Sequence, residues 1–222
     1  MTLFGTRRDM RAPTSAIVAA LFAVAAIRPA YSHPHEFVEM WTEVQMDGTK
    51  ATAMRYRWRF DEFFSAYALE PADPDGDGKV EQAEIEKVHA QILTNIQPID
   101  YFTRFEEKSL QPKLGTATPL ATRLVGRQLE IEFTVPFQSP VDLSEKQLVY
   151  AIYDNEFYIA MNHSVDDIAV QIKGAAKGCS SKMEEANPDE DVREFASSLG
   201  KDESGGQDLG INFAEWVVIS CK

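Results

Sequence analysis

Residues 73–84, which read DPDGDGKVEQAE, have the composition and spacing of a twelve-residue calcium-binding loop. Aspartates fill positions 1, 3 and 5, and a glycine fills position 6, where the chain must turn sharply. Position 7 offers a backbone carbonyl, position 9 a carboxylate, and position 12 a glutamate that can bind through both oxygens. Hard oxygen ligands in this number favour Ca²⁺ over Mg²⁺, which requires a tighter octahedron. The predicted ligands are Asp73, Asp75, Asp77, Lys79, Glu81 and Glu84.

The segments on either side of this loop have the pattern of helices. Asp61 is a candidate N-cap for a helix over residues 61–70, and apolar residues recur at helical spacing between Glu84 and Ile96. The alternative is a surface turn that binds nothing. Because the sequence contains no second loop of this kind, we expect a structural clip rather than a paired sensor. Weak calcium binding, about 10⁻⁴–10⁻³ M, would suffice outside the cytosol.

The first 32 residues have the features of a cleavable signal peptide. Arg7, Arg8 and Arg11 form a basic region, residues 16–27 are apolar, and small residues precede a cleavage point after Ser32. Export through either the general or the twin-arginine route, and hence a periplasmic location, is expected. An uncleaved membrane anchor is the alternative.

Cleavage after Ser32 would create a second candidate metal site. His33 would then offer an α-amine and an imidazole, and His35 would add a second imidazole nearby. Pro34 lacks an amide N–H, which excludes a square arrangement of deprotonated amides around Cu²⁺ or Ni²⁺. The remaining donors suit Zn²⁺, Cu²⁺, Ni²⁺ or Co²⁺. A frayed terminus without metal explains the residues equally well.

Other candidate ligands have simpler alternative explanations. His163 could complete a site with His33 and His35, or it could lie in a solvated turn. His89 lies beside the apolar stripe of the second helix, so a packed core histidine is expected rather than a ligand. The acidic residues of the sequence YDNEFY could bind a cation or belong to a surface turn; they are Asp154 and Glu156.

Alternating patterns indicate a β-rich domain around these sites. Residues 36–46 and 52–60 predict a hairpin with its turn at Asp47-Gly48. Pro136 and Pro140 are expected to break the chain, and the segment around Cys179 to be a loop. The other predicted strands are 101–107, 119–125, 128–135, 147–154, 156–162, 165–172 and 212–222.

The predicted fold class is α+β, mainly an antiparallel β-sandwich or open barrel. The expected divisions are a signal peptide (1–32), a β-rich domain (33–172) with a helix–calcium loop–helix insertion (61–96), and a C-terminal extension (173–222). The extension should consist of a helix, a loop and a strand packed on the same domain. Its cysteines, Cys179 and Cys221, are expected to form a disulfide in an oxidising compartment. Closing a loop of this length contributes about 4 kcal/mol on the loop-entropy model. A pair of soft metal ligands is the alternative.

The charge of the chain limits the class of partner. The net charge is −13 over 222 residues. Residues 1–32 contain four arginines and one aspartate, so their removal leaves 18 basic and 34 acidic residues, a net charge of −16. This argues against nucleic acid as a partner and is compatible with cations. The sequence has no nucleophile or phosphate-loop motif, so we do not expect an enzyme.

Four stretches taken together resemble a known family. They are HPHEFV at the processed start, RWRFDEFFSA before the calcium loop, YFTRF (101–105) and VYAIYDNEFYIA (149–160). The chain resembles exported bacterial proteins catalogued as domain of unknown function 1007, often labelled the periplasmic component of an uncharacterised ABC-type transport system. The resemblance covers nearly all of the mature chain. It implies a role in handling a transition metal, because such proteins are often encoded near nickel, cobalt or zinc transporters.

The expected function is therefore a periplasmic metal-binding protein. It would hold Ca²⁺ in residues 73–84 and a transition metal at His33 and His35, and it would serve an inner-membrane metal transporter. The alternative is a calcium-stabilised envelope binding module with no transition-metal role. A third class, a copper oxidase or oxygenase, would require a third imidazole close to His33.

Overall fold

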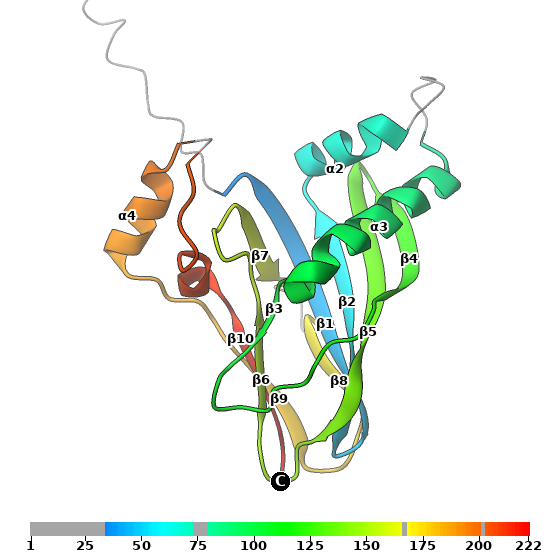
Figure 1. Ribbon diagram of the computed structural model, residues 1–222, viewed down its shortest axis with the longest axis vertical. Helices are drawn as coiled ribbons and strands as arrows, with labels where there is room; N and C mark the ends of the chain where they lie inside the picture. Colours follow the sequence, from blue (N-terminus) through cyan, green and yellow to red (C-terminus); the bar gives the residue numbers. More distant parts are fainter. Residues whose placement is uncertain (1–33, 73–79, 166–167, 201–202) are drawn as a thin grey trace, which may run out of the picture. The chain divides into compact units, whose positions relative to one another are not determined.

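A long hairpin lies at the centre of the larger of two β-sheets (Figure 1). The computed structural model describes residues 34–72, 80–165, 168–200 and 203–222, which belong to the unit Ser32–Lys222. The hairpin strands are β1 (Glu36–Gly48) and β2 (Lys50–Phe60), joined at the predicted Asp47-Gly48 turn. Gly48 has a φ of 63°, a conformation that glycine adopts without strain.

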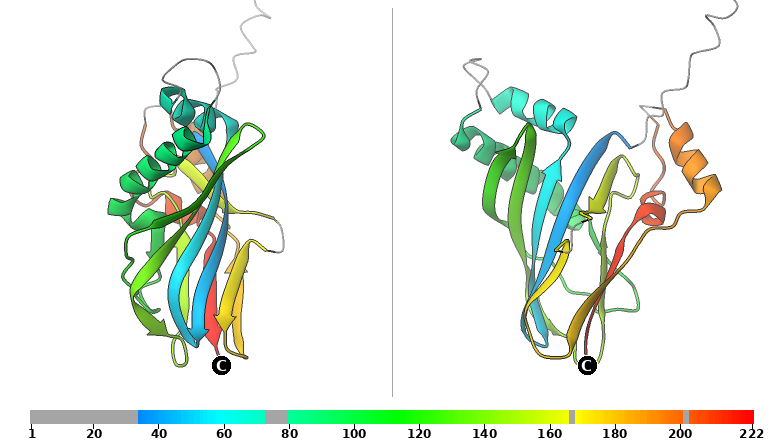
Figure 2. Two further views of the ribbon diagram at one scale, coloured as in Figure 1. Left: turned by 90° about the vertical axis from the view of Figure 1, so that its right-hand side faces the viewer. Right: turned by 180° about the vertical axis from the view of Figure 1, so that it is seen from behind.

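The larger sheet has the order β4-β5-β2-β1-β7, and β8 also pairs with β1. Its further strands are β4 (Thr118–Val125), β5 (Gln128–Asp142), β7 (Ile159–His163) and β8 (Val170–Ala175). The smaller sheet has the order β3-β6-β10-β9. Its strands are β3 (Thr103–Phe105), β6 (Leu148–Ile152), β9 (Cys179–Glu184) and β10 (Trp216–Cys221). Figure 2 shows the two sheets from behind and edge-on.

Strand β2 illustrates why the sheets pack face to face. Met54, Tyr56, Trp58 and Phe60 alternate along it and are buried in the core between the sheets. The Tyr56 ring stacks on Phe133 of β5 at 4.8 Å between ring centroids. Buried residues of β6 and β10 belong to the same core.

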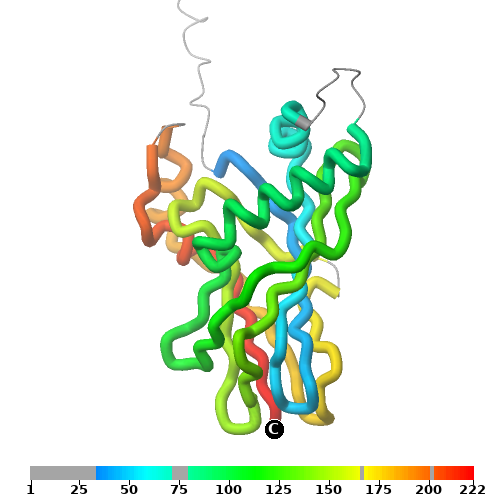
Figure 3. Tube along the Cα trace, turned by 45° about the vertical axis from the view of Figure 1, so that its right-hand side comes forward, coloured from blue at the N-terminus to red at the C-terminus, as the bar shows by residue number. Residues whose placement is uncertain are grey.

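Three α-helices complete the described fold: α2 (Glu62–Leu69), α3 (Gln82–Ile96) and α4 (Glu190–Ser198). Asp61 is the N-cap of α2, as predicted, and its carboxylate accepts hydrogen bonds from the amides of Phe63 and Phe64. Helix α3 crosses beside β4 (Figure 3). Its buried side chains Ile85, His89, Leu93 and Ile96 recur at helical spacing. Short 3-10 turns cover Glu70–Ala72, Gln97–Phe102 and Gly210–Phe213.

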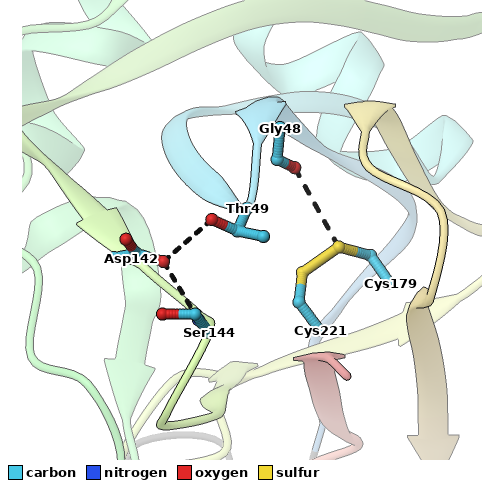
Figure 4. Close-up of a disulfide and its surroundings, with 6 residues drawn as sticks. All are labelled: Gly48, Thr49, Asp142, Ser144, Cys179 and Cys221. Atoms are coloured by element: carbon cyan, nitrogen blue, oxygen red, sulfur yellow. Dashed lines mark hydrogen bonds between the residues drawn. A yellow bond between two sulfur atoms is a disulfide. The ribbon is translucent and has the colours of Figure 1, made fainter.

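The predicted α+β class, rich in antiparallel pairs, is confirmed, and so is the predicted disulfide. Cys179 and Cys221 are directly opposite each other on the antiparallel strands β9 and β10. The bridge lies beside the β1–β2 turn, where the Cys179 sulfur is 4.0 Å from the carbonyl oxygen of Gly48 (Figure 4). In the same region Thr49 donates a hydrogen bond of 2.9 Å to Asp142 at the end of β5.

Three sequence expectations need correction. β5 continues through both prolines: Pro136 is opposite Ala53, and Pro140 lies in the stretch before Val141 where the pairing with β2 shifts register. β9 was missed because its exposed, polar residues do not show apolar alternation. The strand expected over 101–107 is confined to β3, since Asp100, Tyr101 and Phe102 have left-handed backbone conformations with φ values of 53–57°.

The edge of β1 also departs from a purely antiparallel sheet. β7 pairs in parallel with Glu36–Met40, and β8 pairs in parallel with the second half of β1. Two short strands thus follow one another along a single long strand. Gly174 permits the close approach of β8, since a Cβ there would lie 2.3 Å from the carbonyl oxygen of Met46.

Candidate functional site

Helices α2 and α3 flank the predicted calcium loop. Helix α2 ends at Leu69, and α3 begins at Gln82 with Glu81 as its N-cap. The Glu84 carboxylate accepts the amide N–H of Glu81 at 2.8 Å, so positions 9 and 12 of the motif lie on one helical turn. Val80 packs against the main core. Four of the predicted ligands lie outside the described residues: Asp73, Asp75, Asp77 and Lys79.

The N-terminal histidine pair is described only in part, because His33 lies outside the described residues. The amide of His35 donates a hydrogen bond of 2.9 Å to the carbonyl oxygen of Tyr158. The two side-chain rings stack with 4.6 Å between their centroids. His35 is therefore held at the start of β1, against the turn that leads into β7.

Carboxylates lie around this end of β1. Burial raises the pKa of Glu36, and the negative charges of Asp61 and Asp154 raise it further. The oxygens of Asp154 accept amide hydrogen bonds from Glu156, Tyr158 and Ile159, so this residue shapes the turn beside His35. Glu156 instead accepts a hydrogen bond of 2.7 Å from the hydroxyl of Ser204. Asp154 thus has a clear structural role in the YDNEFY turn.

His163 is buried between the sheets rather than solvated in a turn. Its Nδ1 lies 2.9 Å from the Glu215 carboxylate, and its Nε2 lies 3.3 Å from the hydroxyl of Thr42. Thr42 in turn lies 2.8 Å from the hydroxyl of Tyr150 on the smaller sheet. His163 is opposite Met40, five residues along β1 from His35, which corresponds to about 16 Å. The structure therefore does not bring His163 and His35 together.

His89 is packed in the core, as predicted. It is 1% exposed, and its Nδ1 lies 2.6 Å from the hydroxyl of Thr122 on β4. Burial lowers the pKa of His89 to about 4. Within the ranges that the structure describes, no group of three or more His, Cys, Asp or Glu side chains is placed to hold a metal ion.

The outer surface of the larger sheet carries an array of charges that the sequence analysis did not assemble. We call this surface the charged face. It comprises Trp41 and the charged residues Glu39, Glu43, Arg55, Arg57, Arg59, Arg123, Glu130 and Glu132. Its most buried member, Glu130, is 1% exposed and accepts two hydrogen bonds from Arg59 at 2.7 and 2.9 Å. Glu130 also pairs with Arg123, and Arg55 pairs with Glu132 at 2.5 Å.

A signal for the charged face exists in the sequence. Arginines alternate along β2, so they lie on one face of the sheet. The Asp47-Gly48 turn alone does not place Trp41 opposite Arg57, because the β1–β2 pairing shifts by one residue between Gln45 and Met46. The contribution of β5 could not be predicted in the same way, because residues 61–127, which include α2, α3, β3 and β4, separate β2 from β5 in the sequence.

Comparison with known proteins identifies the family. A family model described as "Protein of unknown function (DUF1007)" matches residues 18–221. The chain belongs to this family. The chain is also similar to an uncharacterized protein of Haemophilus influenzae, with 27% identity over 194 residues. The match covers 86% of this chain and 92% of that protein.

The helices described for this DUF1007 protein are short. In the described part of the chain, none has the length and apolar character needed to cross a membrane.

Proposed function

We propose that the protein is an exported metal-binding protein that holds Ca²⁺ in residues 73–84 and a transition metal at its processed N-terminus. The transition metal would be Ni²⁺, Co²⁺, Zn²⁺ or Cu²⁺, and an inner-membrane metal transporter would be its partner. The observation that carries the calcium proposal is the helix pair around a complete set of oxygen ligands. The geometry of Glu81 and Glu84 on the first turn of α3 supports it.

The chemistry of the donors fits calcium. Asp73, Asp75, Asp77 and Glu84 would provide negatively charged oxygens, and Lys79 would provide a carbonyl oxygen. Bound Ca²⁺ would neutralise the mutual repulsion of these carboxylates and join the end of α2 to the start of α3. A structural role is therefore favoured over a regulatory one.

The N-terminal proposal rests on different observations. His35 is anchored beside Tyr158, and the negative charges of Glu36, Asp61 and Asp154 surround the start of β1. A cation at His33 and His35 would be attracted by these charges. The imidazoles and the terminal amine would supply the borderline nitrogen ligands that Zn²⁺, Ni²⁺, Co²⁺ and Cu²⁺ accept.

Calcium binding is tested by titration calorimetry and by thermal unfolding with calcium or chelator. We expect Glu84→Gln to weaken calcium binding at least about tenfold, since the substitution removes a charged ligand. Glu86→Gln, at an exposed position on the same helix, is the matched control and should bind calcium normally. A wild-type protein with the same melting temperature in saturating calcium and in chelator would contradict the calcium proposal.

The N-terminal site is tested on protein purified from the cell envelope, by intact mass and metal content. We expect a chain that starts at His33 and carries about one equivalent of transition metal beside calcium. The double substitution His33→Ala, His35→Ala should abolish transition-metal binding, with calcium binding as the internal control. Calcium alone in the wild type would instead identify the protein as a calcium-stabilised envelope binding module.

A further inference from the structure

Two members of the charged face, Arg57 and Glu43, are outside its network of ion pairs. Arg55 pairs with Glu132, and Arg59 and Arg123 both pair with Glu130. Neither Arg57 nor Glu43 has an ion-pair partner among the residues that the structure describes. One positive and one negative group therefore remain available on a face whose other charges are matched.

Arg57 is fixed in position without being neutralised. Its guanidinium carbon lies 3.7 Å from the centroid of the Trp41 ring, directly across the β1–β2 pair. Its Nε is buried and has no hydrogen-bond partner in the described chain. Stacking on an aromatic ring restricts the guanidinium and leaves its in-plane donors free for a carboxylate.

Glu43 is a negatively charged side chain that likewise has no ion-pair partner in the described part of the chain. The residue opposite it on β2 is Arg55, whose charge is already directed to Glu132 at 2.5 Å. The Oε1 atom of Glu43 is buried, and no donor in the described ranges reaches it. Buried polar atoms without partners are uncommon in folded proteins and require an explanation.

Arg57 and Glu43 line the same depression on the charged face. Its volume is about 210 Å³, and Trp41 and Gln171 also line it. A space of this size suits a molecule of a few heavy atoms. A simple anion would approach Arg57 but would be repelled by Glu43, and a simple cation would meet the opposite problem.

We propose that this depression binds a small zwitterion, with a free α-amino acid of small side chain as the ligand class. Arg57 binds the carboxylate, Glu43 binds the ammonium group, and the Trp41 ring forms the apolar wall. A ligand with zero net charge leaves the balance of the charged face unchanged. This site is separate from residues 73–84 and from the N-terminal histidines, and it does not rest on the proposed metal function.

The test is a titration of ¹⁵N-labelled protein, followed through its indole N–H signals. The chain has three tryptophans, of which Trp58 lies in the core at 1% exposure. We expect L-alanine to shift the Trp41 signal with a dissociation constant of about 1 mM or tighter, while Trp58 is unaffected. Acetate and ethylammonium, which each carry one of the two charges, should bind at least about tenfold more weakly.

Substitutions assign the two roles. Arg57→Gln should weaken alanine binding at least about tenfold, and Glu43→Gln should remove the preference for alanine over acetate. Arg127→Gln is the control, because the Arg127 side chain is 81% exposed and lies outside the depression. If the Arg57→Gln protein does not fold, the proposal is tested with the nearly isosteric Glu43→Gln alone, by comparing its binding of alanine and acetate. The proposal is overturned if about 10 mM alanine leaves the Trp41 signal unchanged, or if acetate binds as tightly as alanine.

Discussion

The α2–α3 helix pair and the charged face both gather carboxylates, but the two regions do so by different means. At the helix pair, the candidate ligands follow one another within residues 73–84, so their spacing in the sequence sets their chemistry. On the charged face, Glu39, Arg59, Glu130 and Arg123 come from four strands and meet only through strand register. Local spacing can be recognised in the sequence, whereas an array built by register exists only in the folded sheet.

The largest effect is expected where register creates a buried ion pair. Glu130→Gln should lower the free energy of unfolding by about 3–5 kcal/mol, because Arg59 and Arg123 lose a charged partner that is 1% exposed. Urea unfolding measures the change. The control is Glu62→Gln at an exposed pair with Arg127, which should cost less than about 1 kcal/mol. Equal effects of the two substitutions would show that the charged face behaves as an ordinary surface.

An intermediate effect is expected where α3 meets the sheet, at His89. The pKa of this imidazole is about 4 in the folded protein, against 6.5 for an ordinary histidine. Between about pH 4 and about pH 6.5, His89 therefore stays neutral in the folded protein, whereas the same side chain binds a proton in the unfolded chain. Stability is unaffected above about pH 6.5 and falls by about 2–3 kcal/mol as the pH decreases toward about 4.

Substitution isolates this histidine from other acid effects. His89→Gln retains a side chain that can bond to Thr122, and it should reduce the stability difference between about pH 7.5 and about pH 4.5. Urea unfolding of both proteins at the two pH values measures that difference. An unchanged difference would mean that other groups cause the acid sensitivity.

The smallest of the three effects is expected at a mainly local contact, the N-cap of α2. Asp61→Ala should cost about 1–2 kcal/mol, since the carboxylate accepts the amides of Phe63 and Phe64 and also that of Phe37. Asp61→Asn keeps an acceptor and should cost less. Thermal unfolding distinguishes them, and a loss from Asp61→Ala as large as that from Glu130→Gln would remove the contrast between local and register-built contacts.

Features set by local spacing could be predicted from the sequence, whereas features set by strand register could not. Short-range patterns identified the hairpin, both helices around residues 73–84 and the N-cap Asp61. They did not show that β7 and β8 share the edge of β1, because pairing between residues more than a hundred positions apart leaves no local pattern. β9 was missed for a related reason, since an exposed edge strand such as CSSKME needs no apolar face.

The candidate sites also differ in whether local spacing or contacts between distant strands bring their residues together. Asp73 to Glu84 could be proposed from spacing alone, but the burial of His163 against Glu215 and Thr42 depends on contacts between the two sheets. The separation of Arg57 and Glu43 from the other ion pairs likewise depends on where β5 lies. Residue type and parity place these side chains on a face, and only the register determines which of them pair.

The position of β10 has a consequence for how the protein acquires its structure. This strand, formed by Trp216–Cys221, follows all the other described strands in the sequence, yet it lies inside the smaller sheet between β6 and β9. The smaller sheet therefore remains incomplete until β10 has been synthesised, and the edge of β1 remains unpaired until β7 and β8 have been synthesised. Completion of both sheets thus depends on contacts between distant parts of the chain, which is expected to make folding slow.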